Sequence, residues 1–132
     1  MKHLNYQTLQ DLNYDGYLLN EAPERVLQFG EGNFMRAFVD FFIDKMNETA
    51  NFNSKVVLVQ PIPKFTTPDV GDFINEQEGL YTLYLRGSEN GQEVSSKRVI
   101  SCISRCLNAY SDYEAVMECA KNPELRFITC NT

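Results

Sequence analysis

The sequence predicts an α/β fold of the Rossmann type, a partial doubly wound parallel sheet with an inserted β-hairpin. An apolar run at residues 25–29 ends in Gly30 and Gly32, and a helix-spaced apolar pattern follows at once. A second apolar run occupies residues 55–60. Strand, glycine loop, helix and strand in this order form a βαβ unit, and continuous apolar strands are typical of parallel sheets covered on both faces.

The helix after the glycine loop is expected to extend to about residue 48, with Asn33 as its N-cap. Phe34, Phe38, Phe41 and Phe42 recur at helical spacing. Such a stripe predicts packing in the core, with Phe34 as a possible exception at the mouth of the loop.

The middle of the chain predicts a hairpin. Residues 64–79 form a long connection, and residues 81–86 are rich in strand formers. Asn90-Gly91 is a strong turn signal, and a second extended segment follows at about residues 93–104.

A second helix and a last strand complete the chain. Ser111 and Glu114 match a capping box, with Ser111 as the N-cap. Tyr113, Val116, Met117 and Ala120 would form its apolar face, and residues 122–123, Asn-Pro, would end it. Residues 125–130 predict the final strand.

These elements give about three parallel strands plus a hairpin, fewer than the roughly six of a complete dinucleotide fold. We therefore expect a lead-in at residues 1–24 and an NAD-binding Rossmann-like domain at residues 25–132. The domain would be a piece of a larger enzyme whose C-terminal substrate and catalytic domain is absent.

The formal net charge is −6, which argues against a nucleic-acid partner because phosphate backbones require a basic face. No apolar run approaches the length of a membrane span, and the polar N-terminus lacks the features of a signal peptide. The expected partner is a small molecule, and the expected compartment is the cytoplasm.

Cysteine usage favours buried, reduced thiols. Cys102, Cys106, Cys119 and Cys130 form no C-x-x-C pair, and His3 is the one histidine. A metal site needs more ligands close together, so no metal ligand is assigned.

The glycine loop is the main chemical signal. Gly30 would permit the tight turn after the strand, and Gly32 would let the backbone approach a pyrophosphate at the helix N-terminus. Met35 occupies the third position of the G-x-G-x-x-G fingerprint. The alternative is that both glycines only form a tight structural turn.

Other positions could complete a cofactor site. Arg36 could contact an anionic group, and Gln60 occupies the place of the acidic residue that bonds the ribose 2′-hydroxyl. Lys64 lies near enough to leave the choice between NAD and NADP open. The residues predicted to contact the cofactor are Gly30, Glu31, Gly32, Asn33, Phe34, Arg36, Gln60, Asn131 and Thr132.

The loop also resembles that of the long-chain mannitol dehydrogenase family. That family has G-x-G-x-F-x-R-A after its first strand, matched here by Gly30, Gly32, Phe34, Arg36 and Ala37. The form Q-F-G-E-G-N-F at residues 28–34 is similar to one branch of that family. This resemblance implies a Rossmann domain that binds NAD, in an oxidoreductase of hexuronate breakdown that interconverts D-altronate and D-tagaturonate.

The resemblance extends along most of the chain from about residue 24. The segments 81–87 and 127–132 are also similar to the family, although Cys130 stands where serine is more usual, and Met35 where other branches have histidine. Family members hold a catalytic lysine, asparagine and histidine in a C-terminal domain. No position here matches that motif, so no catalytic residue is assigned.

Three alternatives stay open at this point. The chain could belong to another polyol or sugar-acid dehydrogenase of the same family. It could be a non-catalytic nucleotide-binding module, or an α/β interaction domain with a structural glycine turn.

Overall fold

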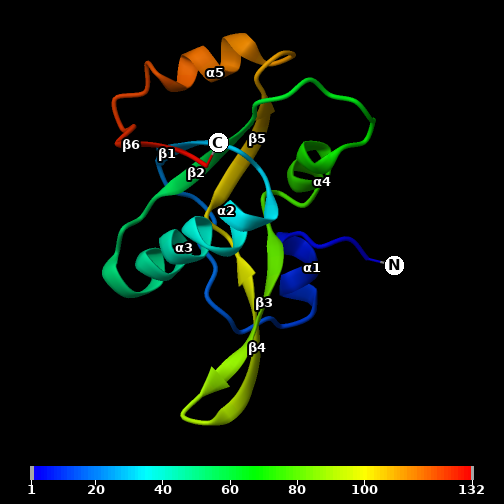
Figure 1. Cartoon of the computed structure of the whole chain (residues 1–132), viewed down its shortest axis with the longest axis vertical. Helices are drawn as coiled ribbons and strands as arrows, with labels where there is room; N and C mark the ends of the chain where they lie inside the picture. The colour runs from blue at the N-terminus through cyan, green and yellow to red at the C-terminus, as the bar shows by residue number, and fades with distance from the viewer. Residues whose placement is uncertain (1, 132) are drawn as a thin grey trace.

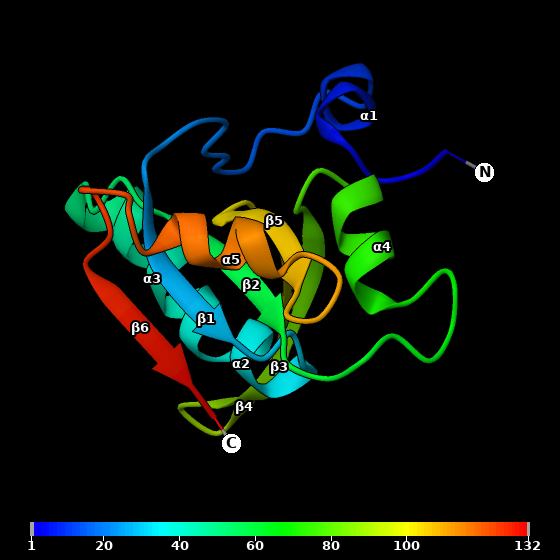
Figure 2. The ribbon, with the colours of Figure 1, turned by 90° about the horizontal axis from the view of Figure 1, so that it is seen from above.

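Four parallel strands form the central sheet of the protein, whose computed structural model describes residues 2–131. Their order is β5-β2-β1-β6, and Figure 2 shows them side by side. The strands are β1 (Glu24–Phe29), β2 (Lys55–Gln60), β5 (Ile103–Asn108) and β6 (Phe127–Cys130). All neighbouring pairs are parallel, which confirms the predicted fold class.

Helices cover both faces of this sheet. The helices are α1 (Tyr6–Asp11), α2 (Asn33–Ala37), α3 (Val39–Ala50), α4 (Val70–Glu76) and α5 (Tyr113–Cys119). α3 and α4 pack on one face and α5 on the other, whereas α1 packs at the base of the hairpin. On one face, Val26 and Leu58 pack with Ile43 of α3 and Ile74 of α4.

The opposite face packs on α5. Leu27, Val57 and Val59 share a cluster with Cys119, and Val116 packs against it. Because successive strand residues point to opposite faces, the apolar runs of β1 and β2 fill both layers. The sheet is therefore doubly wound.

A hairpin of β3 (Tyr81–Glu89) and β4 (Gln92–Ile100) projects from the sheet domain (Figure 1). Its turn lies at Asn90 and Gly91, both with positive φ, as predicted from the Asn-Gly pair.

The second extended segment, predicted as one strand at residues 93–104, divides in two. β4 ends at Ile100 and β5 begins at Ile103 in the parallel sheet. Between them, the amide of Ser101 donates to Asp44 Oδ1 at 2.9 Å, and the carbonyl of Cys102 accepts from the Val56 amide at 2.8 Å. These tertiary bonds redirect the chain, so the sheet has a fourth strand that the sequence pattern did not separate.

The first helix also divides. Gly32, not Asn33, is the N-cap, and Phe38 interrupts the helix between α2 and α3 with φ −118° and ψ −76°. The carbonyl of Arg36, just before the break, accepts the Tyr81 hydroxyl at 2.7 Å. A hydrogen bond from the hairpin thus occupies a backbone carbonyl of the helix where the helix is interrupted.

The predicted core packing is wrong for Phe38 and Phe42, whereas Phe34 is exposed, as its position at the mouth of the loop allowed. Phe34, Phe38 and Phe42 are 63%, 50% and 49% exposed, and Met46 is exposed beside them; we name these four residues the aromatic stripe. Phe41 alone packs against the core. The buried face of α3 instead holds Asp40, Ile43, Asp44 and Asn47.

The connection at residues 64–79 contains α4, which the sequence analysis did not predict. Asp69 is its N-cap and forms a capping box with Asp72. The lead-in likewise contains α1, whose Leu9 packs with Leu80 and Val99 at the base of the hairpin.

The capping box predicted at Ser111 and Glu114 is wrong. α5 begins at Tyr113 with Asp112 as its N-cap and no side-chain capping bond. Asp112 is engaged elsewhere, because its Oδ2 accepts from the Asn108 amide at 2.8 Å. Most of the predicted apolar face is also wrong, since Tyr113, Met117 and Ala120 are exposed and Val116 alone packs on the sheet.

The cysteine prediction holds for Cys102, Cys106 and Cys119, which are buried thiols. It is wrong for Cys130, which is exposed at the end of β6. None of the helices in residues 2–131 has the length and apolarity needed to cross a membrane.

Candidate functional site

Gly30 lies at the end of β1 in a conformation that other residues rarely adopt, with φ +124°. Its amide donates to the Val59 carbonyl at 2.9 Å. A Cβ at this position would lie 2.8 Å from Asn131 Oδ1. The position therefore requires glycine, and the predicted residues Gly30 and Asn131 lie against each other.

Gly32 differs, because nothing in the described chain requires a glycine there. Its φ is −66°, and no atom lies within 4 Å of the position a Cβ would occupy. The space beside Gly32 is open at the start of α2, where the first amides of a helix have no intrahelical acceptor. A missing side chain at this point lets a ligand approach the backbone closely.

The Arg36 side chain is hydrogen-bonded to the glycine loop. Its Nε donates to the Glu31 carbonyl at 2.8 Å, and its Nη2 donates to Asn33 Oδ1 at 2.7 Å. The guanidinium lies over the Tyr81 ring, 5.4 Å from the centroid. These contacts join three predicted residues, Glu31, Asn33 and Arg36, into one unit.

Two buried polar side chains support the loop from within, and sequence reasoning missed both. Gln28 Nε2 donates to the Gly30 carbonyl at 3.1 Å and to Asp40 Oδ2 at 3.0 Å. Both residues are fully buried. Burial raises the pKa of Asp40 to about 7, against the opposing effects of the Gln28 hydrogen bond and the Arg36 charge. The sequence did contain one signal for this pair, because Gln28 is a polar residue within an otherwise apolar strand.

Gln60 ends β2, the neighbour of β1, and is almost wholly buried. Its Oε1 accepts from Asn108 Nδ2 at 3.1 Å. Beside it, at the carboxyl ends of β2 and β5, lies a polar pocket of about 270 Å³, whose lining includes Gln60, Lys64, Asp69, Asn108 and Asp112. Ligands of open α/β sheets bind at this edge.

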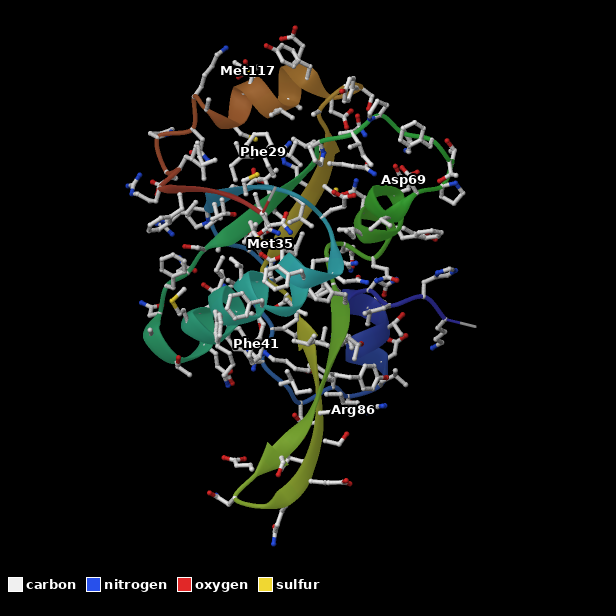
Figure 3. The ribbon with its side chains drawn as sticks, in the orientation of Figure 1. Phe29, Met35, Phe41, Asp69, Arg86 and Met117 are labelled. Carbon is white, nitrogen blue, oxygen red and sulfur yellow. The ribbon has the colours of Figure 1, made fainter. Side chains whose placement is uncertain are left out.

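Carboxylates already neutralise the cation in this pocket. Lys64 Nζ lies 2.6 Å from Asp72 Oδ1 and 3.8 Å from Asp69 Oδ1. Asp69 lies beside α4 (Figure 3), and its Oδ2 is buried without a hydrogen-bond partner in the described chain. Sequence reasoning missed Asp69, although an acidic residue three positions before Asp72 is a capping signal.

The remaining predicted residues lie at the outer side of the loop. Phe34 is exposed and stacks on Phe38 with ring centroids 5.5 Å apart. Asn33 is exposed as well. Thr132 lies outside the described residues, so its predicted role stays a prediction.

Comparison with known families gives one match over most of the chain. Residues 24–131 match the family described as "Mannitol dehydrogenase Rossmann domain". Proteins named altronate oxidoreductase are similar: that of Phocaeicola vulgatus is 47% identical over 124 residues, 94% of this chain, and that of Bacillus subtilis is 45% identical over 127 residues. The chain spans about a quarter of the length of these relatives, 25% in each case.

Solved structures agree with the fold. Mannitol 2-dehydrogenase of Pseudomonas fluorescens, in a ternary complex with NAD and D-mannitol, superposes with a TM-score of 0.76 at 26% identity. It matches over 98% of this chain and 26% of its own. A D-sorbitol dehydrogenase in substrate-free form has a TM-score of 0.79 at 22% identity, over 97% of this chain and 26% of its own.

Proposed function

Since the chain belongs to the mannitol dehydrogenase family and matches its Rossmann domain, we propose that it is the NAD-binding part of an oxidoreductase. The open space beside Gly32 at the start of α2 is the observation that supports this most directly. In this proposal the backbone from Gly30 to Asn33 faces the pyrophosphate. Phe34 and Asn131 lie at the edge of the same site.

The adenosine half of the cofactor is proposed to lie at the carboxyl end of β2. Gln60 and the pocket next to it would contact the ribose hydroxyls, as residues at this strand end do in dinucleotide folds. Because Asp72 and Asp69 already neutralise Lys64, an added 2′-phosphate would meet carboxylates. We therefore propose NAD rather than NADP.

The proposed substrate pair is D-altronate and D-tagaturonate. It rests on relatives named altronate oxidoreductase that are 42–47% identical over nearly the whole chain. When bound, the cofactor would supply the hydride that reduces the tagaturonate carbonyl carbon, with a proton added to its oxygen. Another sugar acid or polyol is the second candidate, because the structural neighbour with bound NAD also holds D-mannitol.

We propose residues 25–132 as the dinucleotide domain and residues 1–24 as its lead-in. The catalytic groups and most of the substrate site would belong to a further domain of a longer polypeptide, since the relatives are about four times as long.

Calorimetric titration with NADH and NADPH tests the cofactor. We expect NADH to bind more tightly than NADPH. Gly32→Asp should lower NADH affinity by about tenfold or more, roughly 1.4 kcal/mol, because a carboxylate would occupy the space proposed for the pyrophosphate. No described atom lies within 4 Å of the Cβ that the substitution adds, so thermal stability should not fall.

Gly87→Asp is the matched control. Gly87 lies in the hairpin, and its Cβ position is also free of contacts, so this variant adds the same charge elsewhere and should bind NADH normally. Equal NADH binding by Gly32→Asp and the parent would overturn the assignment of the loop. The longer gene product is assayed with NADH on tagaturonate and on fructose. The substrate that it reduces faster decides between the two candidates.

A further inference from the structure

Gln28 links the glycine loop to the interior of the domain. Its Nε2 donates both to the Gly30 carbonyl, at 3.1 Å, and to Asp40 Oδ2, at 3.0 Å. Gln28 and Asp40 are both 0% exposed, so neither can touch a ligand. The hydrogen bond from this pair to the loop ends on the Gly30 carbonyl.

One oxygen on each side chain is left over. Gln28 Oε1 and Asp40 Oδ1 are buried and have no hydrogen-bond partner within the described chain. An amide oxygen and a carboxylate oxygen are both acceptors, so they cannot satisfy each other. A proton on Asp40 Oδ1 would turn that atom into a donor, the kind of group that the Gln28 amide oxygen lacks.

The groups around Asp40 compensate a negative charge there only in part, because the effect of burial is larger than theirs. Arg36 of α2 attracts it, but its Nε and Nη2 bond to the loop. Tyr81 of β3 and Cys102, which precedes β5, also face it, and burial raises the pKa of both, so both stay neutral. The Cys102 thiol donates to the Asp40 backbone carbonyl at 3.2 Å, not to its carboxylate.

We propose that Gln28 and a protonated Asp40 are positioning residues of the glycine loop, which hold the Gly30 carbonyl and so the shape that the dinucleotide meets. The effect on binding rests on the proposed function, but the effect on the loop does not. Without that proton both oxygens are buried acceptors that have no donor in the described chain. The loop is then expected to loosen as pH rises.

The direction of the pH effect follows from linkage. The pKa of Asp40 is raised by burial from 3.8 to about 7 in the folded chain. The folded state therefore holds this proton more tightly than the unfolded state. Between about pH 4 and pH 7 the unfolded chain has lost the proton and the folded chain keeps it, so stability falls as pH rises through this window. This contribution is full below pH 4.

Two measurements without cofactor test the pair. The amide resonances of Gly30 and Gly32 are followed by ¹⁵N NMR between pH 5 and pH 9, and thermal unfolding is measured over the same range. We expect the two glycine amides to titrate together near pH 7 in the parent, and its unfolding temperature to fall from pH 5 to about pH 7 and then to level off. Asp40→Asn, whose amide can donate to Gln28 without a charge, should abolish that titration and unfold at a higher temperature than the parent at pH 8.

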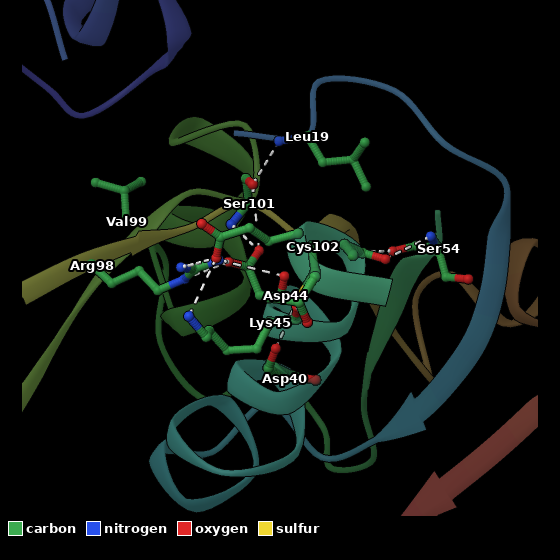
Figure 4. A network of polar contacts seen from close by, with 12 residues as sticks. Leu19, Asp40, Asp44, Lys45, Ser54, Arg98, Val99, Ser101 and Cys102 are labelled. Atoms are coloured by element: carbon green, nitrogen blue, oxygen red, sulfur yellow. Dashed lines mark hydrogen bonds and ion pairs between the residues drawn. The ribbon is translucent and has the colours of Figure 1, made fainter. Parts of the chain in front are cut away.

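Asp44→Asn is the matched control. Asp44 is a buried carboxylate one turn further along α3, and it is paired with Arg98 at 2.7 Å (Figure 4). Asp44→Asn should unfold at a lower temperature than the parent, but its Gly30 and Gly32 amides should still titrate with pH as in the parent. The same titration in Asp40→Asn as in the parent, or no movement of the Gly30 and Gly32 amides with pH in the parent, would overturn the proposal.

Titration with NADH at pH 6 and pH 8 adds the functional readout. Affinity of the parent should fall with pH, at most about tenfold per unit above the pKa, and that of Asp40→Asn should not. Absence of NADH binding by the parent at both pH values would count against the proposed function, while the NMR titration would still decide the role of Asp40.

Discussion

Arg36 occupies the first turn of a helix that follows a glycine loop, where a cation suggests an anionic ligand. The structure directs its Nε and Nη2 inward, to the Glu31 carbonyl and the Asn33 side chain. The Tyr81 ring packs beneath the guanidinium, and the Tyr81 hydroxyl bonds to the Arg36 carbonyl. At the scale of single residues, the geometry predicts that Arg36 supports the loop, whereas its charge predicts that it attracts an anionic ligand.

Substitution of Arg36 by lysine separates the two. Lysine keeps the charge but lacks the planar set of donors, so a bracing role predicts that Arg36→Lys weakens NADH binding nearly as much as Arg36→Ala. A charge role predicts that lysine restores binding. Calorimetry on both variants measures this, with Arg86→Lys in the exposed hairpin as a control that should behave as the parent.

At the scale of elements, α3 buries its acidic side and exposes its aromatic side. Asp44, fully buried, pairs with Arg98 of β4 at 2.7 Å and accepts from the Ser101 amide at 2.9 Å (Figure 4). The helix is thus joined to the hairpin and to the segment that begins β5 by charged hydrogen bonds.

We expect Asp44→Asn to lower the free energy of unfolding by about 3 kcal/mol, as loss of one partner of a buried ion pair does. Chemical denaturation measures the change. Glu48→Gln is the comparison, because Glu48 contacts the same Arg98 at 2.7 Å from a more exposed position and should cost less than about 1 kcal/mol. Equal losses in the two variants would contradict this account of α3.

At the scale of the whole molecule, the aromatic stripe is an apolar surface on the outside of α2 and α3. Phe34, Phe38 and Phe42 are each about half exposed or more, and exposed apolar patches of this kind mark interaction sites.

The stripe predicts how the 132-residue chain behaves in solution. We expect it to associate at high concentration, and Phe38→Ser with Phe42→Ser to make it monomeric without lowering its thermal midpoint. Sedimentation and thermal unfolding measure the two properties. Phe41→Ala is the control, since Phe41 packs on the core and its loss should be destabilising; an equal loss from the Phe38 and Phe42 changes would show that the stripe belongs to the core.

Local pattern predicted much of this fold. β1, β2, β6 and the hairpin turn at Asn90-Gly91 lie close to where the sequence placed them, because apolar runs and turn dipeptides act over a few residues. The boundary between β4 and β5 was not predictable, since it depends on bonds from Ser101 and Cys102 to other elements. Helical spacing showed that the phenylalanines share a face, but not that this face is outside.

The sequence by itself determined the βαβ order, the glycine that the turn at Gly30 requires, and the resemblance that identified the family, because each is encoded within a short segment. The tertiary structure alone decided that Asn131 lies against Gly30, that Asp69 joins Gln60 at one pocket, and that Gln28 and Asp40 are buried together behind the loop. Each of these pairs joins residues from different elements, and only packing of the sheet against its helices and loops sets such distances.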